Sequence, residues 1–176
     1  MNKLENPVRL AELSPPETLA RLGLQDGMSF ADIGAGSGIF TTAAAARTRA
    51  PVFAVDPSET MRGMLEEKKR KGRLEQVQIF DDIAKLPAGA ADLALLCTVL
   101  HEIAERASFL AAVREKLKPG GCLAVIEFHK APSPFGPPPA VRIGEDEVAR
   151  LALSAGMEQT CSFSLGENFY CACFRA

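Results

Sequence analysis

Three glycines, Gly34, Gly36 and Gly38, stand within five residues of one another, directly after the apolar run that carries Asp32. Glycines allow the backbone to approach a ligand where a Cβ atom would collide, and the first turn of a helix presents unpaired amide groups. The GxGxG spacing departs from the GxGxxG or GxGxxA fingerprint of dinucleotide-binding loops, because Ile39 fills the last position. The segment therefore predicts a ligand-binding loop of another kind, and a tight turn without a ligand is the alternative.

Two further acidic positions follow predicted strands. Asp56 comes 22 residues after Gly34, where a carboxylate could accept hydrogen bonds from both hydroxyls of a ribose. Asp82, followed by Ile83, supplies an acceptor and an apolar wall suited to a purine that carries an amino group. Each aspartate could instead cap a helix or lie in a solvated turn, but acids at successive strand ends favour a shared site.

The chain has only two histidines, His101 and His129, and both follow predicted strands. Either could act as a general base at the rim of a site, and a helix or loop histidine bonded to the backbone is the alternative. Glu102 and Glu127 lie at the same rim, where solvated or capping roles are the simpler interpretation. Tyr170, the single tyrosine, is expected to pack in a hairpin.

The five cysteines are scattered and odd in number, which predicts neither a disulfide framework nor a zinc site. Free, buried thiols are expected instead. Cys171 and Cys173 are two residues apart, so a strand would send both side chains into the core from one face of the sheet.

Short apolar runs alternate with amphipathic segments along the chain. This pattern predicts a Rossmann-like α/β fold, a doubly wound, mostly parallel seven-stranded sheet with a C-terminal antiparallel hairpin. The expected strands are Met28–Ile33, Pro51–Val55, Val77–Phe80, Leu93–Cys97, Cys122–Phe128, Met157–Ser164 and Phe169–Phe174. The expected helices are Ser37–Arg49, Pro57–Gly72, Glu145–Ala155 and one that presents Leu110, Val113 and Leu117 on a single side.

Two segments, the N-terminal residues and a proline-rich loop, are expected to lie at the rim of the site. Ser14-Pro-Pro-Glu17 indicates a capping box that begins a short helix ending near Leu22. Residues 1–24 are expected to form an N-terminal helical cap. Residues 131–143 are expected to form a stiff rim loop, because five of the twelve prolines fall between Ala131 and Pro139. The whole chain, 1–176, is expected to be a single domain.

Charge and hydropathy restrict the partners. The 176 residues carry 20 basic and 22 acidic side chains, no tryptophan and one tyrosine, which argues against a nucleic-acid substrate. No apolar run is long enough to cross a bilayer and no signal peptide is evident, so neither membrane insertion nor secretion is expected. The sequence therefore predicts a soluble, cytoplasmic protein, and leaves homodimer formation open.

Five segments, in matching order and spacing, resemble the class I S-adenosylmethionine-dependent methyltransferases, particularly the type 11 or UbiE-like group. They are Asp32-Ile-Gly-Ala-Gly-Ser-Gly38, Asp56-Pro-Ser-Glu-Thr-Met61, Asp82-Ile-Ala-Lys-Leu-Pro87, Asp92-Leu-Ala-Leu-Leu-Cys-Thr-Val-Leu-His-Glu-Ile103 and Leu117-Lys-Pro-Gly-Gly-Cys-Leu123. The resemblance covers about Met28 to Phe128. Ala91 replaces the family's usual Phe, Glu102 its second His, and Cys97 the more frequent Ser or Asn.

The resemblance implies S-adenosyl-L-methionine as the cofactor. Its glycine loop should pass beneath the methionine part, Asp56 should hold the ribose, and Met61, Asp82 and Ile83 should contact adenine. The backbone around Cys97 and Thr98 should lie near the amino group of the cofactor. The full set of implied cofactor-binding residues is Asp32, Gly34, Ala35, Gly36, Gly38, Asp56, Pro57, Met61, Asp82, Ile83, Cys97 and Thr98.

The function expected from this resemblance is direct, in-line transfer of a methyl group to a small-molecule acceptor. The reagent is already activated, so no catalytic triad is needed, and the sequence assigns no catalytic residue. The N-terminal segment, the proline loop and Arg142 are the candidates for acceptor specificity. A non-catalytic module that binds the cofactor, and a nicotinamide oxidoreductase with an aberrant glycine loop, are the alternatives.

Overall fold

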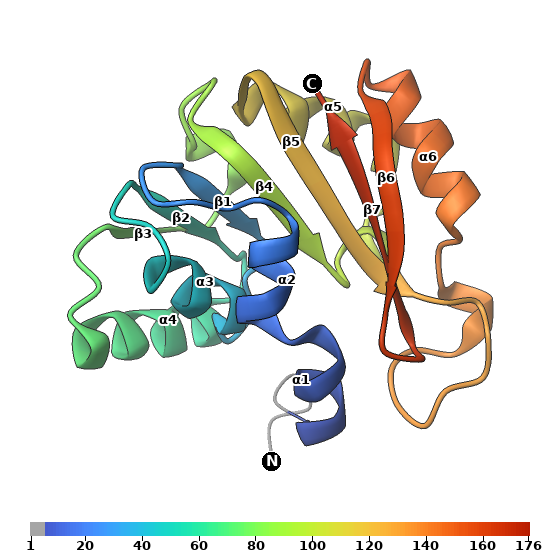
Figure 1. Cartoon of the computed structure of the whole chain (residues 1–176), viewed down its shortest axis with the longest axis horizontal. Coiled ribbons are helices and arrows are strands. Elements are labelled where there is room, and N and C mark those ends of the chain that lie inside the picture. Colours follow the sequence, from blue (N-terminus) through green and yellow to red (C-terminus); the bar gives the residue numbers. More distant parts are fainter. Residues whose placement is uncertain (1–5) are drawn as a thin grey trace.

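The computed structural model describes residues 6–176, so the first five residues of the expected cap at 1–24 lie outside the described part. The strands form one seven-stranded sheet in the order β3-β2-β1-β4-β5-β7-β6 (Figure 1). Their bounds are β1 Phe30–Ile33, β2 Val52–Val55, β3 Val77–Phe80, β4 Ala91–Cys97, β5 Leu117–Phe128, β6 Glu158–Leu165 and β7 Phe169–Arg175. Strands β1 to β5 are parallel and β7 is antiparallel to both neighbours, which confirms the predicted sheet and hairpin.

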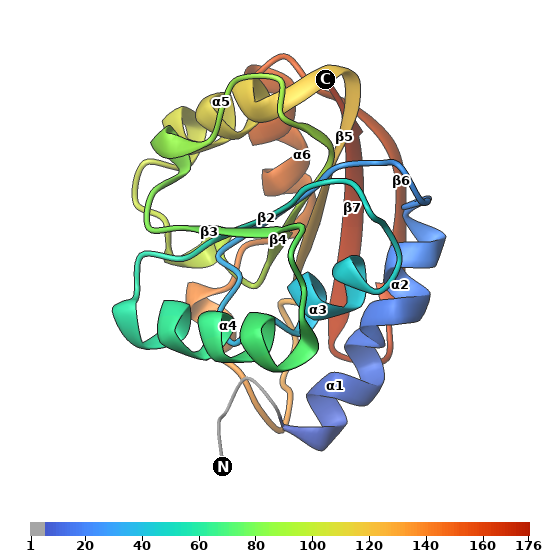
Figure 2. The same cartoon turned by 90° about the vertical axis from the view of Figure 1, so that its left-hand side faces the viewer.

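Helices cover both faces of this sheet (Figure 2). The bounds of the helices are α1 Pro7–Leu13, α2 Pro15–Arg21, α3 Ile39–Ala45, α4 Glu59–Gly72, α5 Arg106–Lys116 and α6 Glu145–Ser154, with short 3-10 helices η2 Ile83–Lys85, η3 Leu100–Glu102 and η4 Pro139–Val141. Helices α5 and α6 lie on one face, and α2, α3 and α4 lie on the other. Within residues 6–176 no helix is both long and apolar enough to cross a membrane.

The central strands are apolar because both of their faces are covered. All four residues of β1 and of β2 are buried. Leu110 of α5 and Val148 of α6 join the core on one face, whereas Leu19 of α2 and Phe40 of α3 join the core on the other. Burial of the strands on both sides fixes their carboxyl ends, where the loops that carry the candidate site begin.

The beginning of the chain differs from the prediction. Helix α1 was not expected; Asn6 caps it by accepting hydrogen bonds from two backbone amides of the first turn, and Pro7 begins it. The expected capping box at Ser14 is wrong, because this residue joins α1 to α2 in a left-handed conformation with φ of 35°. Its hydroxyl donates to the carboxylate of Glu17 and caps no amide.

Two predicted elements have bounds that differ from the structure by more than two residues. Helix α3 ends at Ala45 and not near Arg49, because the chain leaves the helix where the Thr48 hydroxyl donates to the Met28 carbonyl (2.9 Å). Leu117 was expected on the apolar side of a helix, but it begins β5, where it pairs with Ala91. Strand β5 therefore starts before the Lys-Pro-Gly-Gly segment, which forms an irregular step inside the strand.

Strand order reverses between β1 and β4, which are neighbours although β2 and β3 lie between them in the sequence. In open α/β sheets, the crevice at such a switch point is the usual ligand site. The loops after β1, β2 and β4 all open at this edge of the sheet. The topology therefore brings the glycine loop, Asp56 and the segment after Cys97 together.

Candidate functional site

A cavity of about 560 Å³ lies at the carboxyl ends of the strands around the switch point. This volume falls in the range typical of small-molecule sites. The predicted cofactor-binding residues that line it are Asp32, Gly34, Ala35, Gly36, Asp56, Pro57, Met61, Asp82, Ile83, Cys97 and Thr98. The structure thus brings eleven of the twelve predicted residues to one cavity.

Gly38 is the exception. It is not part of the cavity wall, and a Cβ atom at this position would collide with the side chain of Leu65 on α4. Its φ of 83° also lies in the left-handed region, where it ends the loop and precedes α3. The structure therefore assigns Gly38 to the packing of α3 against α4, and the proposed contact with a ligand is left to the other two glycines.

The loop after β1 is held by the end of β2. The amides of Gly34 and Ala35 both donate to the Val55 carbonyl, at 2.8 and 3.0 Å. The Gly36 amide donates to Oδ2 of Asp56 at 2.8 Å, and the Ser58 amide donates to Oδ1 at 2.9 Å. Each carboxylate oxygen can accept a second hydrogen bond. Asp56 therefore fixes the glycine loop and keeps acceptor capacity on the cavity side.

Asp32 lies at the bottom of the cavity and is 2% exposed. Burial raises the pKa of its carboxyl group to about 6, although the Thr41 hydroxyl, which donates at 2.6 Å, opposes the shift. The neighbouring Ser37 hydroxyl is buried and has no hydrogen-bond partner among the described residues. Both groups line the cavity, and both would gain from a polar ligand placed beside them.

The outer wall of the cavity combines Ile83 and Met61 with Asp82. Asp82 is exposed, and its Oδ1 accepts from the Ala84 amide at 2.9 Å, so the residue does cap the short helix η2. The alternative interpretation of Asp82 as a helix cap is therefore confirmed. Its second carboxylate oxygen stays available beside two apolar side chains, an arrangement suited to a flat ring with an amino group.

Arg9 of α1 is a cavity residue that the sequence did not reveal. Its side chain is buried, and its Nη2 donates to Oγ1 of Thr98 at 2.8 Å and lies 3.9 Å from Sγ of Cys97. The guanidinium places a fixed positive charge in a wall that is otherwise acidic and apolar. The one available signal was the Asn6-Pro7 pair that begins α1.

Helix α1 is docked by a second contact. The carboxylate of Glu12 accepts from the backbone and side-chain amides of Asn168, at 3.2 and 2.6 Å, in the turn between β6 and β7. A Cβ atom at Gly166 in that turn would collide with Glu12, so the turn approaches the helix as closely as a glycine allows. The hairpin therefore fixes the helix that carries the Arg9 guanidinium.

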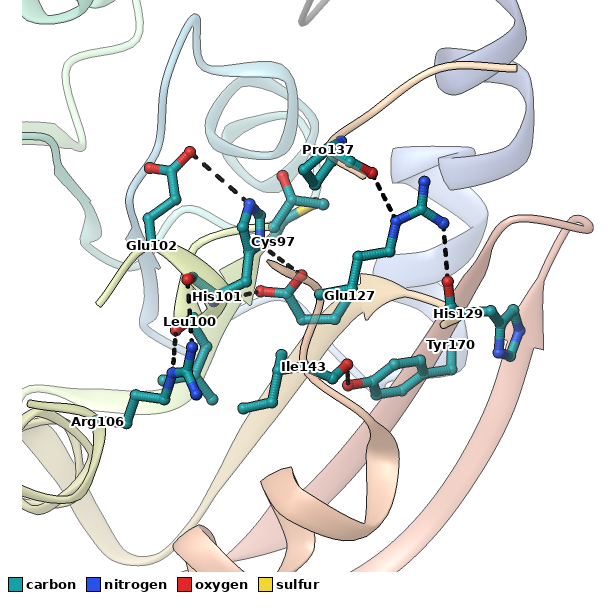
Figure 3. A network of polar contacts seen from close by, with 12 residues as sticks. Cys97, Leu100, His101, Glu102, Arg106, Glu127, His129, Pro137, Ile143 and Tyr170 are labelled. Atoms are coloured by element: carbon teal, nitrogen blue, oxygen red, sulfur yellow. Dashed lines mark hydrogen bonds and ion pairs between the residues drawn. The ribbon is translucent and has the colours of Figure 1, made fainter. Parts of the chain in front are cut away.

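His101 and Glu127 form a pair behind the cavity wall (Figure 3). Nδ1 of His101 lies 2.8 Å from Oε2 of Glu127, and the backbone amide of His101 donates to Oε1 at 3.2 Å. Both side chains are nearly covered, at 9% and 1% exposure. The hydrogen bond to Glu127 raises the pKa of His101. Nε2 lies 3.8 Å from the carboxylate of Glu102, which is itself part of the wall.

The second candidate base, His129, and the single tyrosine, Tyr170, lie away from the cavity. The Nε2 atom of His129 is 3.5 Å from the Ser164 hydroxyl, and its ring packs against Tyr170 at a centroid separation of 5.7 Å. The Tyr170 hydroxyl donates to the carbonyl of Ile143 at 3.0 Å, which agrees with its expected packing role. Neither residue is part of the cavity wall.

Arg142 fastens the proline loop. Its guanidinium donates to the carbonyls of Pro137, His129 and Ala131 at 2.7–2.8 Å, and to the Ser133 hydroxyl at 2.6 Å. The group is buried and does not line the cavity. Its hydrogen bonds are directed into the loop, so the structure gives it a role in shaping the rim.

Comparison with known proteins agrees with this site. The family model described as "Methyltransferase domain" matches residues 31–125, more than half of the chain. The ubiquinone biosynthesis O-methyltransferase of Xanthomonas campestris pv. campestris is 28% identical over 149 residues, which are 83% of this chain and 58% of that protein. The chain thus spans less than two thirds of the length of this relative.

Solved structures give the same result. A methyltransferase from Aquifex aeolicus, described as dependent on S-adenosylmethionine, superposes with a TM-score of 0.91 at 27% identity and covers 98% of this chain and 95% of its own. The fold is also that of a Burkholderia thailandensis 1,6-didemethyltoxoflavin-N1-methyltransferase, with a TM-score of 0.71, 24% identity and coverage of 94% and 77%. The protein belongs to the class I S-adenosylmethionine-dependent methyltransferase family.

Proposed function

We propose that this protein transfers a methyl group from S-adenosylmethionine to a small-molecule acceptor. The observation that carries the proposal is the cavity at the switch point, where Asp56 directly follows β2 and holds the glycine loop through Gly36. The family match supports the reaction class. The acceptor is a small molecule in this proposal because the cavity volume of about 560 Å³ lies in the range typical of small-molecule sites.

The polar groups of the cavity fit the cofactor. Asp56 has spare acceptor capacity for ribose hydroxyls, and Asp82 with Ile83 suits an adenine ring. A cationic amino group would compensate the buried charge of Asp32, and the Ser37 hydroxyl would gain a polar neighbour. The guanidinium of Arg9 brings a positive charge to the cavity wall beside Thr98.

S-adenosylmethionine supplies a methyl group already activated by a positively charged sulfur. The protein must hold the donor and the acceptor in line and exclude water. Positioning of this kind can contribute on the order of 7–11 kcal/mol. The apolar side chains of Val99, Ile103 and Phe109 line the cavity beside Arg9. They are proposed to form the acceptor end of the site, with residues 6–24 and the proline loop at 131–143 at its rim.

His101 is the proposed base for an acceptor that must lose a proton. Glu127 accepts the proton on Nδ1, which leaves Nε2 as the basic atom on the side of Glu102 and the cavity. Because Nε2 lies behind the wall, the proton would reach it through one water molecule. The raised pKa of His101 means that the base is active only above that pKa. His129 is not proposed, since it contacts the hairpin.

Transfer of a labelled methyl group tests the proposal. The purified protein is incubated with methyl-labelled S-adenosylmethionine and the small-molecule fraction of a bacterial extract. Transfer of label to a small product, abolished by omission of the protein, is the expected result. Tight binding of S-adenosylhomocysteine without transfer to any fraction would favour the non-catalytic module instead.

The base is tested with His101→Gln and the control His129→Gln. The rate of transfer by the unaltered protein should rise with pH through the raised pKa of His101 and then level off. His101→Gln should lower the rate about 10²–10⁴-fold and remove this inflection, while His129→Gln should leave both unchanged. An unaltered pH profile in His101→Gln would contradict the role. Equal binding of S-adenosylhomocysteine by all three proteins would confirm that the cofactor site is intact.

A further inference from the structure

Thiols from three strands converge on a second, smaller cavity. Cys122 of β5, Cys161 of β6 and Cys173 of β7 line a space of about 100 Å³, together with Arg21 of α2. Figure 1 shows these strands side by side at the edge of the sheet formed by the C-terminal hairpin. None of the residues that line this space belongs to the wall of the larger cavity. The cluster is therefore not part of the proposed methyl-transfer site.

Cys161 and Cys173 face each other across the hairpin. They are direct partners in the antiparallel register of β6 and β7, next to an irregular step between Gln159 and Cys161. Directly opposed residues in antiparallel strands have Cα atoms about 4.5–5.5 Å apart, which lies within the range that a disulfide can span. Cys161 is exposed and Cys173 is 7% exposed. Both residues of the pair line the small cavity, and Cys161 is also exposed to solvent.

The surroundings favour a reactive thiolate on Cys173. Hydrogen bonding with Cys171 lowers the pKa of its thiol, with further contributions from Cys161 and from the charge of Arg21. Arg21 is held in place over the ring of Phe163, with its guanidinium carbon 3.5 Å from the ring centroid. Partial desolvation and the neighbouring Cys173 raise the pKa of Cys161, so Cys161 remains a thiol when Cys173 ionises. Redox-sensitive cysteines are typically reachable thiolates next to a second, resolving cysteine.

We propose that Cys173 and Cys161 form a peroxide-sensitive dithiol. The Cys173 thiolate attacks one oxygen of hydrogen peroxide, the O–O bond breaks, and Cys173 becomes a sulfenic acid with release of hydroxide. The Cys161 thiol then attacks the Cys173 sulfur, which forms the S–S bond and releases water. Two thiols are oxidised and one peroxide is reduced to water. The product is a cross-strand disulfide that a dithiol reductant reverses.

The other thiols are placed less well for this bond. Cys171 is two residues from Cys173 on the same strand, about 6.6–6.8 Å apart along the chain, and it is fully buried. Cys122 is the register partner of Arg175, whereas the β5 partner of Cys173 is Ala124. Cys122 therefore serves as the control with the same chemistry in the same cavity, whereas Cys171 tests how far its hydrogen bond contributes to the reactivity of Cys173.

The test is oxidation of the reduced full-length protein by graded hydrogen peroxide, followed by intact mass and peptide mapping. Cleavage after Glu167 separates Cys161 from Cys171 and Cys173. The expected product has lost two hydrogen atoms and carries a Cys161–Cys173 bond, which also forms in Cys122→Ser and Cys171→Ser. In Cys161→Ser, sulfenic acid on Cys173 should persist and react with dimedone. Arg21→Gln should slow oxidation at neutral pH at least about twofold.

Three outcomes would overturn the proposal. The first is a disulfide that maps to Cys122 or Cys171 in the unaltered protein. The second is oxidation confined to the exposed Cys161, with Cys173 left reduced. The third is an unchanged rate of disulfide formation in Cys161→Ser. Near-ultraviolet circular dichroism of each reduced variant shows whether the fold is intact, so that a misfolded variant is replaced by the matching alanine.

Discussion

Oδ2 of Asp56 accepts a hydrogen bond of 2.8 Å from the amide of Gly36. The carboxylate at the end of β2 thereby holds the loop at the end of β1, so two neighbouring strands share one polar contact at the candidate site. The contact joins two residues that are 20 positions apart in the sequence, and the positive φ of Gly36, 54°, favours a glycine at the donor position. Asp56 can therefore affect a ligand in two ways. It can accept hydrogen bonds from the ligand, and it fixes the position of the glycine loop.

Replacement of Asp56 by alanine should weaken binding of S-adenosylhomocysteine by about 1.5–3 kcal/mol, because hydrogen bonds to a charged group are lost. Isothermal titration calorimetry measures the effect. Asp26→Ala is the matched control, since Asp26 forms an exposed ion pair with Arg49. Equal affinities in the two variants would remove Asp56 from the binding site.

Gly34→Ala and Gly27→Ala separate backbone strain from collision. Both glycines have positive φ, of 77° and 88°, so both variants incur a cost of about 1–2 kcal/mol. A Cβ atom at Gly34 would also collide with Val99, whereas one at Gly27 meets open space. Gly34→Ala should therefore reduce the free energy of unfolding more, and Val99→Ala should restore part of the loss. Denaturant titration of the three variants measures this, and equal losses would contradict the close approach.

Binding of S-adenosylhomocysteine should depend on pH through Asp32. Its carboxyl group has a pKa raised to about 6 in the free protein, so it is neutral below that pH and charged above it. A bound ammonium group favours the charged form, and affinity should therefore rise as pH increases through about 6. Asp32→Asn should give an affinity that is constant across this range. Calorimetric titrations at pH 5 and pH 7.5 make the comparison, and an equal pH dependence in both proteins would exclude Asp32.

The Asp32 carboxyl should also make the free energy of unfolding depend on pH. A carboxyl whose pKa is raised by folding binds its proton more tightly in the native state, so its contribution to the free energy of unfolding falls as pH rises from about 4 to 6.

Arg142→Gln should release the proline loop. The guanidinium loses hydrogen bonds to three carbonyls and to Ser133, at a cost of about 1.5–3 kcal/mol. Chymotrypsin should then cleave faster after Phe135, which lies within the loop. Arg150→Gln on the exposed side of α6 provides the control. If both variants resist cleavage as the unaltered protein does, the loop does not depend on Arg142.

Much of the site could be predicted because its residues follow strands. The glycine loop and Asp56 directly follow β1 and β2, and Asp82 is the second residue after β3, so the parallel order of the strands alone brings them to one edge. Gly38 shows the limit of this reasoning. It belongs to the same motif, but its neighbour in space is Leu65, and only the packing of two helices reveals that contact.

The acceptor end could not be predicted in the same way. Arg9 reaches Thr98 across 89 positions of sequence, through a helix whose direction depends on the contact between Glu12 and Asn168. The pairing of His101 with Glu127 could not be predicted either. Glu127 was one of several acids expected at the rim, and only the folded structure shows that its side chain is buried against His101. Spacing predicts contacts within a motif, whereas contacts between distant segments arise only from the folded chain.

Calorimetric titration of the unaltered protein, with S-adenosylhomocysteine in one experiment and NAD in another, tests the cofactor assignment most directly. We expect one molecule of S-adenosylhomocysteine to bind per chain and NAD to give no heat beyond dilution. Binding of NAD in place of S-adenosylhomocysteine, or of neither compound, would contradict the assignment of this cavity.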